Sequence, residues 1–232
     1  TCTDACMEGL QVLSEKYQVP VQSHLSEGLD EIEWVKQLKP GLSCYGEAYD
    51  MYDLLGSRQP AVMAHVVHPN EAEYELIKHR NVLVAHCPQS NTNAANGVAP
   101  ILQMVHDGIR VGLGTDMAGG YNLNLLRTMT DAIQASKLRW CFTERNGDPF
   151  AKKNFLTVAN AFYLATKGGG SFFGKVGSFE PDYEFDAVVL DDAALADFVE
   201  RPVQDRFQRI LWLYTADTVT AKFIQGTCVY QA

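Results

Sequence analysis

Four residues of the types that bind metals or move protons stand at or just after the ends of short apolar runs. These residues are His24, His65, His86 and Asp116. Neutral imidazole nitrogens and a carboxylate oxygen suit zinc and other borderline divalent metals. A single histidine at a strand end is more often a hydrogen-bonded structural residue. Three in succession, followed by an aspartate, favour one shared site if the runs are parallel strands whose carboxyl ends meet.

Glu27 follows His24 by three residues and offers a base for the same site. A metal-activated water needs a neighbouring group that accepts its proton and returns it to the leaving group. The alternative is that Glu27 lies in the first turn of a helix and offsets the helix dipole. The remaining histidines fall at a helix start or on helix faces and are expected to be structural: His68, His79 and His106.

Asp116 lies within Val111–Tyr121, which reads VGLGTDMAGGY. An apolar run that stops at a carboxylate and continues into glycines is typical of an α/β barrel strand that carries a catalytic acid. The alternative is a tight strand-to-helix turn in which Asp116 caps the next helix.

The apolar runs predict four strands, and periodic apolar positions predict the helices between them. The strands are Val21–Leu25, Ala61–His65, Val82–His86 and Arg110–Gly114. The first helix is capped by Thr3 or Asp4 and carries Met7, Leu10, Leu13 and Tyr17 on its apolar face. The other predicted helices are Gly28–Leu38, Glu47–Leu55, Glu71–His79, Val98–His106, Asn122–Arg139 and Asn154–Thr166. Cys87–Gly97 is predicted to be a loop, and Gly168–Gly170 to end the last helix.

Four consecutive strand–helix units predict an α/β fold with a parallel sheet, in an open doubly wound form or a barrel. No G-x-G-x-x-G and no P-loop supports the nucleotide-binding form of the open sheet. Four units make half of an eight-stranded barrel. We therefore expect residues 1–175 to form half a barrel. Residues 176–232, with a strand at Phe185–Leu190 and a hairpin over Val219–Tyr230, are expected to contribute to a small β-rich domain.

The composition narrows the class of partner. The formal net charge of -9 argues against nucleic acid or an anionic membrane surface and favours a small ligand. No apolar run approaches the roughly 20 residues that a membrane span needs. The six cysteines include no C-x-x-C pair, which favours reduced thiols and a cytoplasmic location. Because the chain opens without Met and enters a helix at once, we expect it to be a segment of a longer protein.

Four segments together resemble the amidohydrolase superfamily in its aminohydrolase branch. They are Ser23–Glu27, Ala64-His65, Ala85–Asn91 (AHCPQSN) and Gly112–Asp116 (GLGTD). Within that branch, Asp116–Tyr121 most resembles the guanine deaminase family, as do Gly177–Glu180 and Phe185–Ala187. The resemblance covers the whole chain, but only the second half of a family member.

This resemblance implies a partial TIM-type (β/α)8 barrel, strands five to eight, followed by part of a small β-sandwich-like domain. It implies one zinc ion held by His24 and Asp116, with Glu27 as the proton shuttle. His65 would steady the water and polarise the attacked carbon, and His65, His86 and Asp116 would contact the substrate. The implied reaction converts guanine to xanthine and ammonia in a cytoplasmic homodimer.

The chain departs from the family pattern because it contains no H-x-H pair, which supplies two further metal ligands in that family. Catalytic zinc usually has three protein ligands, so we expect this chain alone to bind zinc weakly and to turn over little substrate. Two alternatives stay open. One is a related enzyme for another amino-heterocycle, such as an adenosine analogue or an s-triazine, and the other is a catalytically inert fragment that keeps the fold. The H-x-E and P-C-x-x-C motifs of the other zinc deaminase design are absent.

Overall fold

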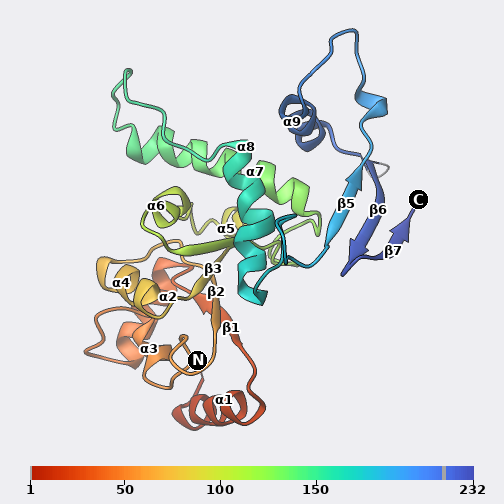
Figure 1. Ribbon diagram of the computed structural model, residues 1–232. Helices are drawn as coiled ribbons and strands as arrows, with labels where there is room; N and C mark the ends of the chain where they lie inside the picture. Colours follow the sequence, from red (N-terminus) through yellow and green to blue (C-terminus); the bar gives the residue numbers. More distant parts are fainter. Residues whose placement is uncertain (1, 216–217) are drawn as a thin grey trace.

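The four predicted strands form one parallel sheet in the computed structural model, which describes residues 2–215 and 218–232. They are β1 (Val21–Leu25), β2 (Ala61–His65), β3 (Leu83–His86) and β4 (Arg110–Leu113). His24 pairs in register with Ala64, and His86 with Leu113. The carboxyl ends of the strands therefore lie along one edge of the sheet (Figure 1).

The strand order distinguishes the two architectures that the sequence leaves open. The strands lie side by side in chain order, β1-β2-β3-β4. A doubly wound sheet reverses its order at a switch point, whereas consecutive barrel strands do not. The prediction of an α/β fold with a parallel sheet is confirmed, and the order is that of a barrel segment.

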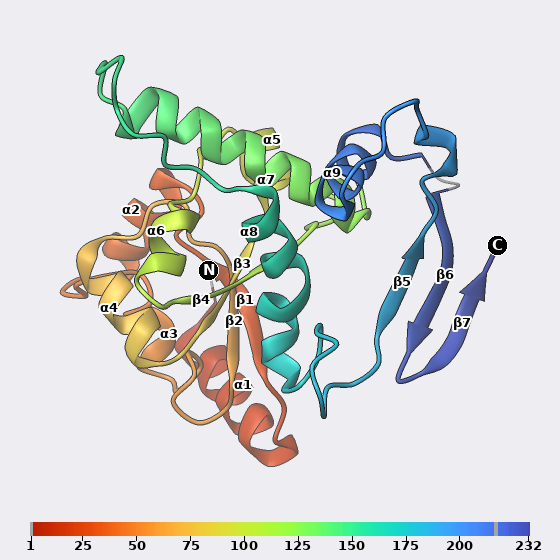
Figure 2. The same cartoon turned by 45° about the horizontal axis from the view of Figure 1, so that its top comes forward.

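Helices follow the strands much as predicted. In the first half of the chain they are α1 (Asp4–Tyr17), α2 (Leu29–Leu38), α3 (Glu47–Asp50), α4 (Glu71–His79), α5 (Pro88–Asn93) and α6 (Ile101–His106). In the second half they are α7 (Leu125–Arg139), α8 (Val158–Tyr163) and α9 (Val203–Leu213), with π-helical segments η1 (Trp140–Glu144) and η2 (Leu164–Gly168) and 3₁₀ turns η3 (Ser171–Phe173) and η4 (Ala193–Leu195). Figure 2 shows α7 and α8 crossing beside β4.

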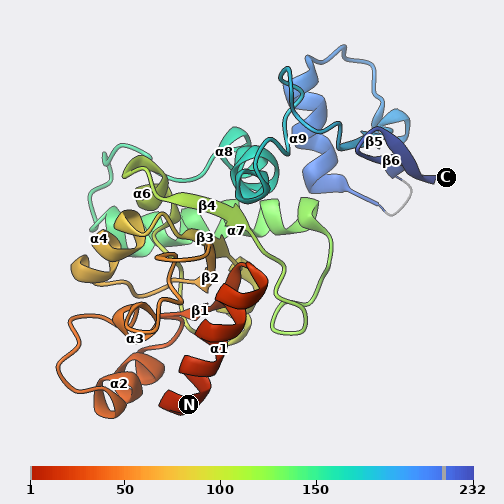
Figure 3. The same ribbon diagram turned by 60° about the horizontal axis from the view of Figure 1, so that its bottom comes forward.

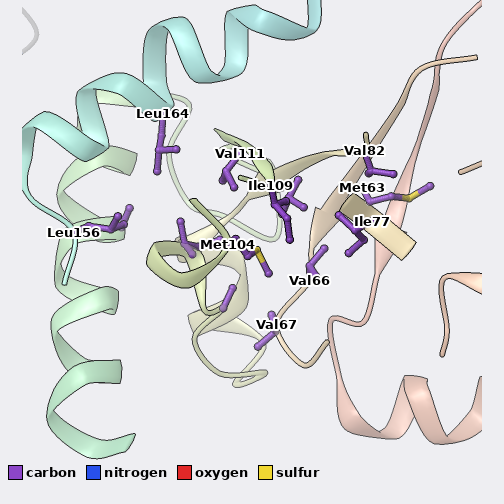
Figure 4. Close-up of a cluster of buried hydrophobic side chains, with 14 of the residues drawn as sticks. Met63, Val66, Val67, Ile77, Val82, Met104, Ile109, Val111, Leu156 and Leu164 are labelled. Carbon is purple, nitrogen blue, oxygen red and sulfur yellow. The ribbon is translucent and has the colours of Figure 1, made fainter. Parts of the chain in front are cut away.

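The core lies between the sheet and the helices that cover it. Met63 of β2 and Val84 of β3 are fully buried, as is typical of parallel strands in a sheet covered by helices. Figure 4 shows Val111 of β4 and Leu164 of η2 in the same apolar cluster as Met104 of α6. This packing fixes the strand ends, and with them the residues that follow.

Glycines let β4 and η2 approach closely. A Cβ on Gly112 would lie 2.8 Å from Cα of Gly169, and one on Gly168 would lie 2.7 Å from the carbonyl oxygen of Val111. The prediction that Gly168–Gly170 ends the helix is wrong, because the helical path continues through η2 into η3. The triglycine run serves close packing instead.

Two further predictions, a loop and a helix, need correction, and one helix was missed. Cys87–Gly97 is not wholly a loop, because α5 begins at Pro88, and proline suits the first helical position. Helix α9 was not predicted, although Phe207, Ile210 and Leu211 follow the i, i+3, i+4 spacing of a buried face. The predicted helix over Glu47–Leu55 is regular only as far as Asp50.

A second sheet forms near the carboxyl end. Strands β5 (Ala187–Leu190), β6 (Val219–Ile224) and β7 (Thr227–Gln231) pair antiparallel in that order, which confirms the predicted strand and hairpin. Figure 3 shows this sheet beyond α9, away from β1 to β4. The division of the chain at residue 175 stays a prediction.

Helix α1 presents its predicted apolar face to the outside. Thr3 caps the helix, and its side chain accepts a hydrogen bond from the amide of Cys6. Leu10 is 45% and Tyr17 61% exposed. In the part of the chain that the structure describes, no helix has the length and apolar character that a membrane crossing requires.

Candidate active site

The predicted site residues gather at the carboxyl edge of the parallel sheet. His65 and His86 are the last residues of β2 and β3, His24 precedes the last residue of β1, and Asp116 follows β4 by three residues. His65 (φ 75°) and Asp116 (φ 46°) both adopt the left-handed backbone conformation, which non-glycine residues rarely do. Such backbone strain clusters at functional sites.

Three of these side chains form a group that could hold a metal ion. Ligand atoms of His24, Glu27 and His65 all lie within 4.8 Å of one another. The two imidazole rings meet edge to face, with centroids 5.1 Å apart. Asp116 adjoins the group through His65, because its Oδ2 lies 4.0 Å from Nε2 of that ring.

The His65 ring is almost fully buried, and its Nδ1 makes a hydrogen bond. Its Nδ1 lies 2.9 Å from the amide oxygen of Asn91. An amide oxygen only accepts, so Nδ1 donates and the Nε2 lone pair turns towards the site. Nε2 lies 3.4 Å from Oε2 of Glu27 and faces Asp116 beyond it. A nitrogen lone pair and two carboxylates converge there without a donor between them, and that donor set fits a bound cation.

Glu27 belongs to the loop between β1 and α2. Its Oε1 accepts a hydrogen bond from Nδ2 of Asn96 at 2.9 Å, while Oε2 faces His65. The acids in the first turn of α2 are Asp30 and Glu31. The alternative that Glu27 is a first-turn acid is therefore wrong, because it precedes the helix and turns its carboxylate to the site.

His86 is buried as fully as His65. It is 1% exposed, and its Nδ1 has no hydrogen-bond partner among the described residues. Burial, with a smaller effect of His65, lowers the pKa of His86 to about 3. The ring is therefore neutral at physiological pH. Burial also raises the pKa of the neighbouring Cys87 thiol to about 12, so this thiol is not a nucleophile near neutral pH.

The loop after Asp116 packs tightly against α5. A Cβ on Gly119 would lie 2.7 Å from Oδ2 of Asp116 and 2.8 Å from Oγ of Ser90. Nδ2 of Asn93 donates to the Gly119 carbonyl at 2.8 Å. Helix α7 is capped by Asn124, so the alternative that Asp116 caps it is wrong.

Sequence reasoning assigned no role to three residues that support the site. Asn91 lies in the quoted AHCPQSN motif, whereas Asn96 follows it without a recognisable pattern. Glu73 of α4 has the sequence signature of an ordinary first-turn acid. It is buried, and it accepts hydrogen bonds from Oγ of Ser26 at 2.6 Å and from the amide of Gly46 at 2.9 Å. Burial raises its pKa, and its contact with Ser26 holds the loop that carries Glu27.

Comparisons with known proteins agree with this architecture. The model of the amidohydrolase family matches residues 1–211. Guanine deaminase of Dictyostelium discoideum is 35% identical over 233 residues, an alignment that covers 97% of this chain and 50% of that protein.

Two solved structures are also similar. A guanine deaminase from C. acetobutylicum, with bound guanine in its active site, is 41% identical with a TM-score of 0.90. The alignment covers 99% of this chain and 53% of that one. E. coli guanine deaminase is 29% identical with a TM-score of 0.86, over 100% of this chain and 53% of that one.

The chain thus spans about half the length of the relatives that it matches. The family model nevertheless covers most of the chain, and the parallel sheet carries the histidines and the aspartate at one edge. This chain belongs to the amidohydrolase family.

Proposed function

We propose that this chain provides much of the active site of a zinc-dependent hydrolase that converts guanine and water to xanthine and ammonia. One observation carries the proposal: ligand atoms of His24, Glu27 and His65 lie within 4.8 Å of one another, with Asp116 adjoining, in a chain 41% identical to a guanine deaminase with bound guanine. The donor set, imidazole nitrogens and carboxylates, matches what zinc prefers in proteins.

In this proposal His24 and Asp116 would hold the zinc ion, and His65 would act with them in the same site. Bound zinc lowers the pKa of a coordinated water towards roughly 7, so that a nucleophile is available near neutral pH. The side chains of His24 and Asp116 are both accessible enough to turn to a shared ligand. His24 is exposed and the Asp116 side chain is 29% exposed.

Glu27 moves the proton. Its Oε2 lies on the side of the site where His65 and Asp116 converge, so it can accept a proton there and deliver it to the departing amine. His65 steadies the reacting groups because Asn91 fixes its ring. His86 and Asp116 line the purine site, where a neutral imidazole and the close-packed Gly119 suit a flat, uncharged ring.

We infer that the full protein is a cytoplasmic homodimer that acts in purine breakdown. Free, exposed thiols at Cys2, Cys6, Cys141 and Cys228 support a reducing compartment. Exposed apolar side chains on α1 and α2, such as Leu13 and Trp34, support further protein contacts on that face.

The test is ammonia release from guanine by the complete protein, including any sequence that flanks this chain. The Glu27→Gln variant keeps the shape of the side chain but cannot carry the proton. We expect its kcat to fall by about 100- to 10,000-fold, the range of general acid–base catalysis. Glu33→Gln, at an exposed carboxylate of α2, is the matched control and should keep full activity.

Unchanged turnover in Glu27→Gln would refute the shuttle assignment. Hydrolysis of an adenosine analogue or an s-triazine in preference to guanine would select the second enzyme hypothesis. If the complete, zinc-loaded protein hydrolyses none of these compounds, the hypothesis of a catalytically inert fragment is favoured.

A further inference from the structure

Asn96 touches Glu27 directly from a distant part of the chain. Its Nδ2 donates to Oε1 of Glu27 at 2.9 Å, across 69 residues of sequence. The amide group also lies against the backbone beside Glu27, since a Cβ on Gly28 would lie 3.3 Å from Oδ1 of Asn96. Asn96 therefore occupies a place that the loop between β1 and α2 leaves open for it.

The backbone of Asn96 is fixed independently of its side chain. Its amide donates to the Asn91 carbonyl at 2.9 Å, and its carbonyl accepts from Nε2 of His68 at 2.6 Å. Ala95 (φ 56°) and Gly97 (φ 118°) on either side have left-handed conformations. Two tight turns thus present the Asn96 side chain to Glu27, and His68 anchors them.

The contact gives the two oxygens of Glu27 different roles. Oε1 is held by the amide N–H, while Oε2 is left to face Nε2 of His65 at 3.4 Å. Without the Asn96 amide, the carboxylate would rotate freely about its last bond, because a terminal carboxylate torsion is broad. A general base must lie within hydrogen-bond reach of the proton that it takes.

We propose that Asn96 is a positioning residue that orients the Glu27 carboxylate towards the reacting groups. The inference rests on the proposed shuttle role of Glu27. Asn96 acts through Glu27 and takes no proton itself. An asparagine suits the position because it brings an uncharged donor of fixed geometry, whereas an aspartate there would oppose one carboxylate with another.

The experiment uses the complete protein and steady-state release of ammonia from guanine. Asn96→Ala should lower kcat by about 10- to 100-fold, the usual effect of losing an outer-shell partner, and leave KM within about threefold. Asn96→Asp should lower kcat further, because it replaces the donor with a like charge. Asn154→Ala, at an exposed asparagine, is the matched control and should leave kcat unchanged.

A double-mutant cycle separates positioning from a general structural role. In the Glu27→Gln background, Asn96→Ala should add no further loss, because the group that it orients is gone. Full kcat in Asn96→Ala, or the same fractional loss in both backgrounds, overturns the inference. If Glu27→Gln itself keeps full activity, the proposed function fails with it.

A crystal structure of Asn96→Ala tests the orientation without turnover. The expected result is a Glu27 carboxylate turned away from His65, with the α5 segment unmoved. A carboxylate that keeps its place overturns the inference, even if the proposed reaction proves correct.

Discussion

His65 shows how single residues build this site. One ring nitrogen contacts the Asn91 amide and the other faces Glu27 and Asp116, so a buried ring links three segments of the chain. The role of each side chain depends on such neighbours. The spacing after His24 makes Glu27 a candidate base, and the contacts with Asn96 and His65 show how its two oxygens are placed.

His86 makes stability depend on pH. Its pKa of about 3 in the folded protein is below the ordinary 6.5, so the unfolded chain takes up a proton first as the pH falls. The contribution of His86 to the free energy of unfolding is therefore fully present above about pH 6.5 and is lost progressively between pH 6.5 and 3. At pH 5 the loss from this residue amounts to about 2 kcal/mol.

Urea unfolding of the complete protein at pH 7.5 and pH 5 measures this loss. His86→Asn removes the titrating ring, so its free energy of unfolding should fall by about 2 kcal/mol less than that of the wild type between these pH values. The exposed His79→Asn variant is the control and should keep the wild-type difference. An identical pH dependence in wild type and His86→Asn would contradict the burial argument.

At the scale of elements, the site depends on the packing of β4 against η2. Gly112 tolerates no side chain, because a Cβ there would lie 2.8 Å from Cα of Gly169, and Asp116 follows four residues after Gly112. Helix α5 then fixes the loop that continues from Asp116, through Asn93 and Ser90. Disrupting these contacts would move the Asp116 carboxylate relative to His65.

Gly112→Ala should therefore destabilise the protein by about 1–3 kcal/mol, because the added Cβ would stand 2.8 Å from Cα of Gly169. Gly9→Ala is the matched control. Gly9 lies within α1 with open space around it, so alanine there should stabilise the helix by about 0.5–1 kcal/mol. Chemical unfolding of both variants checks the pair, and equal effects would show that β4 and η2 are not tightly packed.

At the scale of the whole molecule, the alignments with relatives cover nearly all of this chain but only about half of each relative. Its parallel sheet has four strands in one direction, and α1 and α2 carry exposed apolar side chains. The group of possible metal ligands comprises His24, Glu27 and His65, with Asp116 adjoining. These residues could hold a metal ion.

We expect the 232-residue chain alone to hold well under one zinc ion per molecule after dialysis, because its sequence contains no H-x-H pair that could add two ligands. The complete protein should retain about one. Metal analysis of both samples, dialysed against the same chelator, makes the comparison. Tight, near-stoichiometric zinc in the isolated chain would contradict the expectation.

Much of the fold could be predicted from local pattern. The four strands and the β6–β7 hairpin follow from apolar runs between glycines and prolines, and most helices from their periodicity. Helix α5 escaped prediction because polar residues fill this short helix. Helix α9 was overlooked although its apolar positions have helical spacing. The π-helical η2 escaped because close packing on β4 overrides the tendency of three glycines to end a helix.

The sequence by itself determined which residues are candidates for chemistry: His24, His65, His86 and Asp116 stand at or near strand ends, and Glu27 follows His24 by three residues. Only the tertiary structure decided how they meet. It set Asn96 against Glu27 and Asn91 against His65, and it buried His86 enough to keep it neutral. Residue type and spacing are local properties, whereas hydrogen-bond partners and burial arise from segments that only folding brings together.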